Sequence, residues 1–107
     1  MTLTMFHILV AIADGERHGY AIMQDVAGRT DGNLRLGPGS LYGSIKKMLR
    51  EGLIEELDDR PDPDRDDVRR RYYRLTPHGR KAAMAEAACL AKLLRQARAT
   101  GLAPVKG

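Results

Sequence analysis

Apolar residues recur at helical intervals in three stretches of the first half of the chain. In residues 2–13 they fall on one side of a helix that Thr2 could cap, at Leu3, Phe6, Leu9, Val10 and Ala13. A second helix is expected over residues 19–27, ended by Gly28, and a third over residues 38–51. At 107 residues the chain is long enough for one domain with one modest core.

The third helix separates an apolar side from a small, polar and cationic side. At 100° per residue, Leu41, Ile45 and Met48 share one arc. The opposite side carries Gly39, Ser40, Gly43, Lys46, Lys47 and Arg50, with Tyr42 at its border. Such a helix, backed by a core, fits a DNA major groove, with its cations on phosphates. The alternative is an ordinary amphipathic helix whose lysines are solvated.

Tyr42 has two possible roles at this border. Its hydroxyl could bond a phosphate, or its ring could pack between the third helix and the segment that follows. The residues alone do not favour either role.

Two short apolar pieces, residues 53–57 and 71–75, flank a charged segment that contains two prolines. In the second piece Tyr73 and Leu75 share one face and Tyr72 and Arg74 share the other, which is the period of a strand. The pattern therefore predicts a β-hairpin with a long tip. Residues 33–36 also look extended and could pair with this hairpin.

Charge is distributed unevenly along the hairpin. Residues 58–67 hold six acids and two arginines, whereas residues 69–81 hold six bases and no acid. A basic return strand beside a groove-reading helix could act as a wing that contacts phosphates, through Arg69, Arg70, Arg71 and Arg74. One or two of these arginines could instead pair with neighbouring aspartates, and the acidic tip is more typical of a solubilising loop.

A long helix is expected over residues 77–99, with Thr76 as its cap and Pro77 at its first position. Its apolar residues recur at steps of four, three, four and three, as in a coiled-coil seam, at Ala83, Ala87, Leu90, Leu94 and Ala97. At 1.5 Å per residue the helix is roughly 35 Å long, more than so small a core can cover. We expect a homodimer in which this helix packs against its mate and against the first helix, at Leu3, Phe6 and Val10. The alternative is that the seam packs on its own domain.

These elements together predict a mainly α fold of the α+β kind, a winged helix-turn-helix with a two-stranded wing. Residues 1–75 would form the DNA-binding domain, and residues 76–107 the dimerisation helix and tail. A two-fold dimer presents two recognition helices about one DNA turn apart, so the expected target is an imperfect palindrome in double-stranded DNA. The alternative function is a winged-helix module that binds another protein and not DNA.

Several short pieces, in this order and spacing, carry a family resemblance. They are His18-Gly19-Tyr20-Ala21-Ile22, Gly39-Ser40-Leu41-Tyr42-Gly43, Glu51-Gly52-Leu53-Ile54 and Arg71-Tyr72-Tyr73-Arg74-Leu75-Thr76-Pro77-His78-Gly79. The chain resembles the PadR family of bacterial transcriptional regulators, although Gly43 stands where many members have proline. The resemblance implies a dimeric DNA-binding regulator, here expected to be a repressor, and a small-molecule effector of unknown identity. A stacking pocket for an aromatic effector is not expected, because the chain has no tryptophan and its last helix has no aromatic residue.

Composition adds few constraints. The net charge of +4 is moderate, Cys89 has no partner for an internal disulfide, and no apolar run reaches the length of a membrane span. The expected location is therefore the cytoplasm. The three histidines and the cysteine lack metal-ligand spacing, and Ser40 has no nucleophile motif around it, so neither enzymatic activity nor a cofactor is expected.

Overall fold

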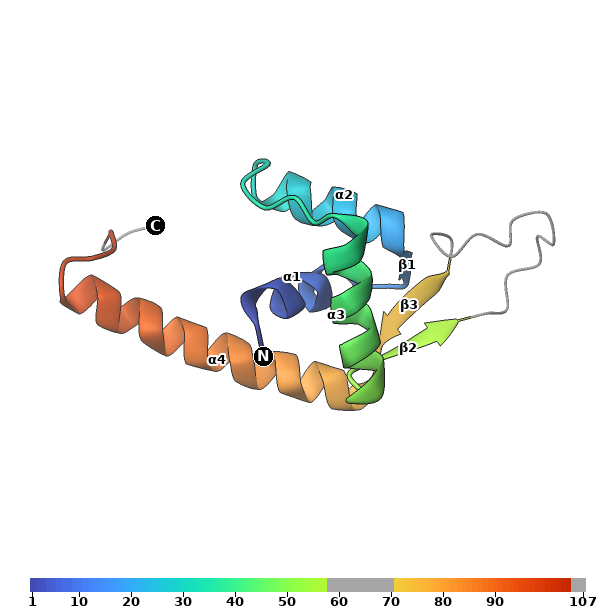
Figure 1. Ribbon diagram of the computed structural model, residues 1–107. Coiled ribbons are helices and arrows are strands. Elements are labelled where there is room, and N and C mark those ends of the chain that lie inside the picture. Colours follow the sequence, from blue (N-terminus) through green and yellow to red (C-terminus); the bar gives the residue numbers. More distant parts are fainter. Residues whose placement is uncertain (58–70, 105–107) are drawn as a thin grey trace.

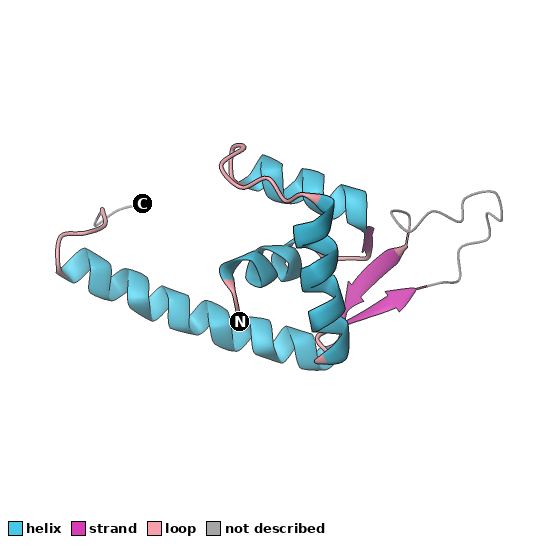
Figure 2. Cartoon of the chain, in the orientation of Figure 1, coloured by secondary structure: helices cyan, strands magenta, loops and turns pink. Residues whose placement is uncertain are grey.

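The computed structural model of the protein describes residues 1–57 and 71–104, which form four helices and a small antiparallel sheet (Figure 1). The helices are α1 (Leu3–Ala11), α2 (Gly19–Arg29), α3 (Pro38–Arg50) and α4 (Pro77–Ala99), and the strands are β1 (Arg17–His18), β2 (Ile54–Leu57) and β3 (Tyr72–Leu75). α1 packs against each of the other helices, and the sheet lies at one side of them (Figure 2). The arrangement is the predicted winged helix-turn-helix, with β2 and β3 as the base of the wing.

Three of the helices begin with a side-chain cap, and two of these caps are the threonines that the sequence predicted. The Thr2 hydroxyl accepts from the Met5 N–H at 3.1 Å, and the Thr76 hydroxyl accepts from the Gly79 N–H at 2.9 Å. At α2 the cap is the His18 imidazole, whose Nδ1 accepts from the Ala21 N–H at 3.1 Å. Each cap satisfies a backbone donor that the helix itself leaves unpaired.

The predicted stop of α2 at Gly28 is wrong, because the helix runs on to Arg29. The chain leaves the helix only at Asp31 and Gly32, where φ is +52° and +79°. The Gly32 N–H then donates to the Ala27 carbonyl at 2.7 Å, which closes the end of the helix. The left-handed pair, and not Gly28, therefore ends α2.

The core lies between α1, α2 and α3 and extends to the start of the sheet. Its largest fully buried side chains are Ile8, Leu9, Ile12, Ile22, Val26, Leu41 and Met48. Burial of one such side chain contributes about 1.5–3 kcal/mol relative to exposure. In α2, Ile22 and Val26 are buried, whereas Tyr20 is 51% exposed.

The third strand of the sheet is not the segment that the sequence suggested. β3 lies in the middle and pairs with β2 on one side and with β1 on the other, where Arg17 is opposite Tyr73 and His18 opposite Tyr72. The prediction that residues 33–36 pair with the hairpin is therefore wrong. The Leu34 N–H donates instead to the Thr30 hydroxyl at 3.0 Å, and Leu36 is buried from a loop.

α4 starts in close contact with the core and then extends past it (Figure 1). The Leu53 carbonyl accepts from the Thr76 N–H at 3.1 Å and from the Thr76 hydroxyl at 3.0 Å. Gly79 is buried against the same carbonyl, and a Cβ at this position would overlap its oxygen. A glycine in the first turn therefore lets α4 approach the chain just before β2, and the helix is directed across α1 from there.

Candidate DNA-binding surface

Six predicted contact residues lie on the exposed side of α3, namely Gly39, Ser40, Gly43, Lys46, Lys47 and Arg50. The opposite side of the helix is buried at Leu41, Ile45 and Met48. This burial fixes the rotation of α3 about its axis, so the small and cationic residues face solvent. No described residue forms an ion pair with Lys46, Lys47 or Arg50.

Gly52 determines where α3 ends. Its φ of +73° allows the Gly52 N–H to donate to the Leu49 carbonyl and the Leu53 N–H to donate to the Met48 carbonyl, at 3.2 and 3.0 Å. This pattern is a Schellman motif, which turns the chain sharply after the helix and inserts Leu53 into the core. The wing therefore starts directly beside the C-terminal end of α3, where the cations are.

Tyr42 does not share this exposure. Its hydroxyl oxygen is buried, and it approaches Gly19 so closely that a Cβ on Gly19 would overlap it. The ring packs against the core between α3 and the start of α2. Of the two roles considered above, this position favours packing, because a phosphate cannot reach a hydroxyl that faces Gly19.

The wing arginines that the structure describes are paired with glutamates of β2. Arg71 Nη1 lies 3.3 and 3.2 Å from the two carboxylate oxygens of Glu56, and Arg74 Nε lies 2.5 Å from Glu55 Oε1. Arg69, Arg70 and the acidic tip lie outside the described residues. The sequence suggested pairing with aspartates and did not identify either glutamate, because the partners depend on the strand register.

Tyr73 joins the wing to the core. It is 2% exposed and stands opposite Glu56 in the ladder. Burial raises the pKa of Tyr73 to about 12, and the Glu56 carboxylate adds to this shift through its charge and a hydrogen bond. The Glu56 carboxylate thus interacts electrostatically with Tyr73 and pairs with the Arg71 guanidinium.

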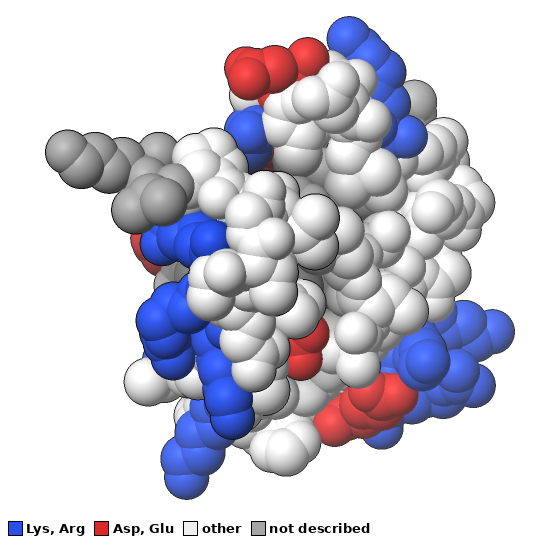
Figure 3. Space-filling view, turned by 90° about the vertical axis from the view of Figure 1, so that its left-hand side faces the viewer, with Lys and Arg blue, Asp and Glu red and all other residues white. Residues whose placement is uncertain are grey.

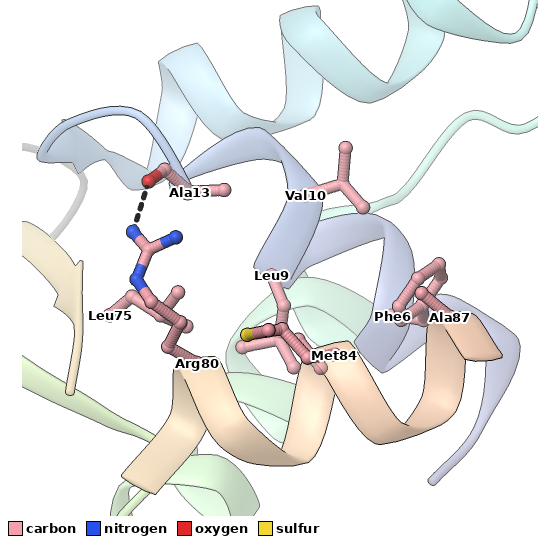
Figure 4. A pocket seen from close by; sticks show the side chains of 9 residues that line it. Phe6, Leu9, Val10, Ala13, Leu75, Arg80, Met84 and Ala87 are labelled. Atoms are coloured by element: carbon pink, nitrogen blue, oxygen red, sulfur yellow. Dashed lines mark hydrogen bonds between the residues drawn. The ribbon is translucent and has the colours of Figure 1, made fainter. Parts of the chain in front are cut away.

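The residues expected at a dimer interface divide into two groups. Ala83 is partly buried against the core, and it lines an apolar pocket of about 190 Å³ between α1 and α4 together with Phe6, Val10 and Ala87 (Figure 4). In contrast, Leu3 is 62% and Leu94 44% exposed, and Leu90 and Ala97 are half-buried on the projecting part of α4. Part of the predicted seam therefore packs on its own domain, and the rest does not.

Arg80 closes one side of the pocket, and the sequence did not suggest this role. Its Nη2 donates to the Ala13 carbonyl at 2.6 Å, just beyond the end of α1 (Figure 4). Met84, which is 66% exposed, lies at the opening on α4. Viewed from the C-terminal end of α4, a broad uncharged area occupies much of the surface, with Lys, Arg, Asp and Glu side chains around it (Figure 3).

A comparison with known families matches residues 8–85 to the PadR-like family of transcriptional regulators. The chain belongs to this family. Two known proteins that are similar to this chain differ in how much of their own length the match covers. The transcriptional regulator Rv3488 of Mycobacterium tuberculosis is 33% identical over 94 residues, which cover 84% of this chain and 78% of that protein. A 37.1 kDa protein in transposon TN4556 of Streptomyces fradiae is 38% identical over 89 residues, 80% of this chain, but the match spans only 22% of that protein.

The PadR-like fold also matches solved structures. The chain superposes on PadR of Bacillus subtilis, solved in complex with operator DNA, with a TM-score of 0.68 at 21% identity. The match covers 81% of this chain and 48% of that one. None of the described helices is long and apolar enough to span a membrane, and the described residues contain no cluster of three potential metal ligands.

Proposed function

We propose that the protein binds double-stranded DNA as a homodimeric transcriptional repressor, with α3 in the major groove. The observation that carries the proposal is the exposed side of α3. It combines three small residues at its N-terminal half with three cations at its C-terminal half, and it is backed by a core that fixes its rotation. Membership of a family of transcriptional regulators supports this function.

The division of work along α3 follows from the residue types. Lys46, Lys47 and Arg50 would contact phosphates, which position a protein on DNA without reading its sequence. Gly39, Ser40 and Gly43 would let the helix approach base edges closely. With no asparagine, glutamine or arginine in this half, specificity would come from serine contacts, bridging water and DNA shape.

A second copy of the chain would complete the binding unit. Leu94 and Leu93 leave 44% and 60% of their surface exposed on the projecting part of α4, and Leu3 is exposed on α1. Burial of such residues in a dimer stabilises it by about 25 cal/mol per Å² of apolar surface. Two copies of α3 would then meet the two half-sites of an imperfect palindrome, roughly 34–36 Å apart on one face of the DNA.

An effector that releases the repressor could use the pocket between α1 and α4. Its volume of about 190 Å³ is below the ~300 Å³ at which pockets for drug-sized ligands begin. A small apolar molecule is therefore the class that it would accept in one protomer.

Selection of bound fragments from genomic DNA by the purified protein tests the proposal. We expect enrichment of a palindromic consensus upstream of a few genes. A consensus without two-fold symmetry would contradict the dimer arrangement, and recovery of no preferred fragment would contradict sequence-specific binding. Repression would then be tested with a reporter gene placed behind the enriched fragment.

A further inference from the structure

The two arginine–glutamate pairs of the wing lie on opposite faces of the β2–β3 ribbon. Glu55 is directly opposite Arg74 and Glu56 directly opposite Tyr73 in the register. Side chains alternate between the faces of a strand, so Arg71, Tyr73 and Glu56 share one face, and Arg74 and Glu55 share the other. The two pairs are therefore chemically alike but differently placed.

The face that holds Arg71 and Glu56 is turned toward α3. Tyr73, which stands opposite Glu56 in the ladder, is part of the core cluster against which Tyr42 of α3 packs. The other face is turned to solvent, because the side chains of Arg74 and Glu55 are 53% and 47% exposed. If α3 lies on DNA, the Arg71 pair is the one that meets the phosphate backbone beside it.

The Glu56 carboxylate binds the Arg71 guanidinium through its oxygens, as a DNA phosphate would. The contacts at 3.3 and 3.2 Å place both carboxylate oxygens at one nitrogen of the guanidinium, the group that recognises phosphate oxygens by charge-assisted hydrogen bonds. A phosphate must therefore displace Glu56 or remain close to its negative charge. The Arg71 side chain is 51% exposed and that of Glu56 is 28% exposed, so DNA can reach the pair from solvent.

We infer that Glu56 competes with DNA phosphate for Arg71 and thereby sets the strength of the wing's contribution to DNA binding. Glu56 lowers the sequence-independent part of the affinity, which arises from phosphate contacts. The inference rests on the proposed function, since it requires that α3 and the wing lie on DNA. Glu56 would therefore be an acidic residue that weakens DNA binding on a surface whose other charged contacts are cations.

Glu56→Gln and Glu55→Gln form a matched pair for the test. Each removes one negative charge and keeps the shape of the side chain, but they act on opposite faces of the ribbon. Binding to a fluorescein-labelled DNA duplex of random sequence would be measured by anisotropy between about 50 and 200 mM salt. A third variant, Glu56→Gln with Arg71→Ala, tests whether any gain passes through Arg71.

Glu56→Gln is expected to tighten binding about two- to fivefold, the range for an exposed ion pair, and to steepen the salt slope by about 0.9 for one further phosphate contact. Glu55→Gln is expected to give less than half of either change. The gain should disappear in the double variant. Circular dichroism melts would establish that all the variants fold, which the exposure of both pairs favours.

Equal effects of the two single variants would overturn the inference, since only net charge would then matter. A gain that persists without Arg71, or no gain at all, would overturn it too. These failures are distinct from failure of the proposed function. If the unaltered protein does not bind duplex DNA, or binds with no dependence on Lys46, the proposed function fails. If it binds in that way and Glu56→Gln changes nothing, only the role of Glu56 is refuted.

Discussion

The same substitution, glycine to alanine, is expected to have opposite effects on stability in α4 and in α2. A Cβ on Gly79 would overlap the carbonyl oxygen of Leu53, which already accepts two hydrogen bonds from Thr76. This carbonyl cannot retreat without loosening the cap of α4. Gly28 lies in α2, is exposed, and has no atom within 4 Å of the position where a Cβ would stand.

The magnitudes follow from these surroundings. At Gly79, overpacking costs about 1–3 kcal/mol, and a weakened Thr76–Leu53 hydrogen bond costs about 1 kcal/mol. The higher helix propensity of alanine offsets about 1 kcal/mol. Gly79→Ala should therefore lower the free energy of unfolding by about 1–3 kcal/mol. At Gly28 only the propensity acts, so Gly28→Ala should raise it by about 0.5–1 kcal/mol.

Urea unfolding followed by far-UV circular dichroism measures both changes. The protomer concentration must be the same in all samples, because association contributes to the stability of a dimer. In thermal melts, 1 kcal/mol corresponds to about 4–8 °C for a domain of this size. A Gly79→Ala protein as stable as Gly28→Ala would mean that α4 does not lie against the Leu53 carbonyl.

Three further outcomes follow from the structure. Leu94→Asp should convert the proposed dimer to monomers and weaken DNA binding, as measured by analytical ultracentrifugation and anisotropy, whereas Leu102→Asp, at an 84% exposed tail position, should do neither. Because the pKa of Tyr73 is raised from 10.0 to about 12 in the folded protein, stability should be intact below pH 10 and fall by roughly 1–3 kcal/mol as the pH rises to 12. Tyr73→Phe should flatten that fall in urea unfolding at stepped pH, and an unchanged profile would contradict the assignment. His18→Ala should cost about 1 kcal/mol through loss of the α2 cap, and His18→Ser, which can still accept from the Ala21 N–H, should recover most of it in the same unfolding assay.

Where an element carries its own signals, the sequence predicts it well. α3 is the clearest case, since Pro38 suits its first turn, Gly52 supplies the positive φ after its end, and the buried residues recur at helical spacing. α4 likewise starts at Thr76 and Pro77, as the cap and the proline suggest. These features depend on neighbours in sequence, so no knowledge of the fold is needed to recognise them.

Features that depend on distant contacts could not be predicted in the same way. β1 consists of only Arg17 and His18, too short to show alternation, and it exists because β3 offers an edge to pair with. The direction of the Tyr42 hydroxyl depends on how closely Gly19 approaches α3.

The wing raised the same difficulty. Its charges were visible in the sequence, but their partners depend on the β2–β3 register, which places Glu55 opposite Arg74. A glutamate that restrains an arginine therefore could not be distinguished from one that faces solvent.

If the exposed side of α3 contacts DNA, the substitution Lys46→Ala must change the salt dependence of DNA binding. The slope of log K against log salt would be compared with those of the unaltered protein and of Lys92→Ala, an exposed lysine on the projecting part of α4. Lys46→Ala should weaken binding to all duplexes and flatten the slope by about one unit for each protomer bound, while Lys92→Ala leaves both nearly unchanged. An unchanged slope for Lys46→Ala, or equal flattening for Lys92→Ala, would show that the exposed side of α3 is not the surface that contacts DNA.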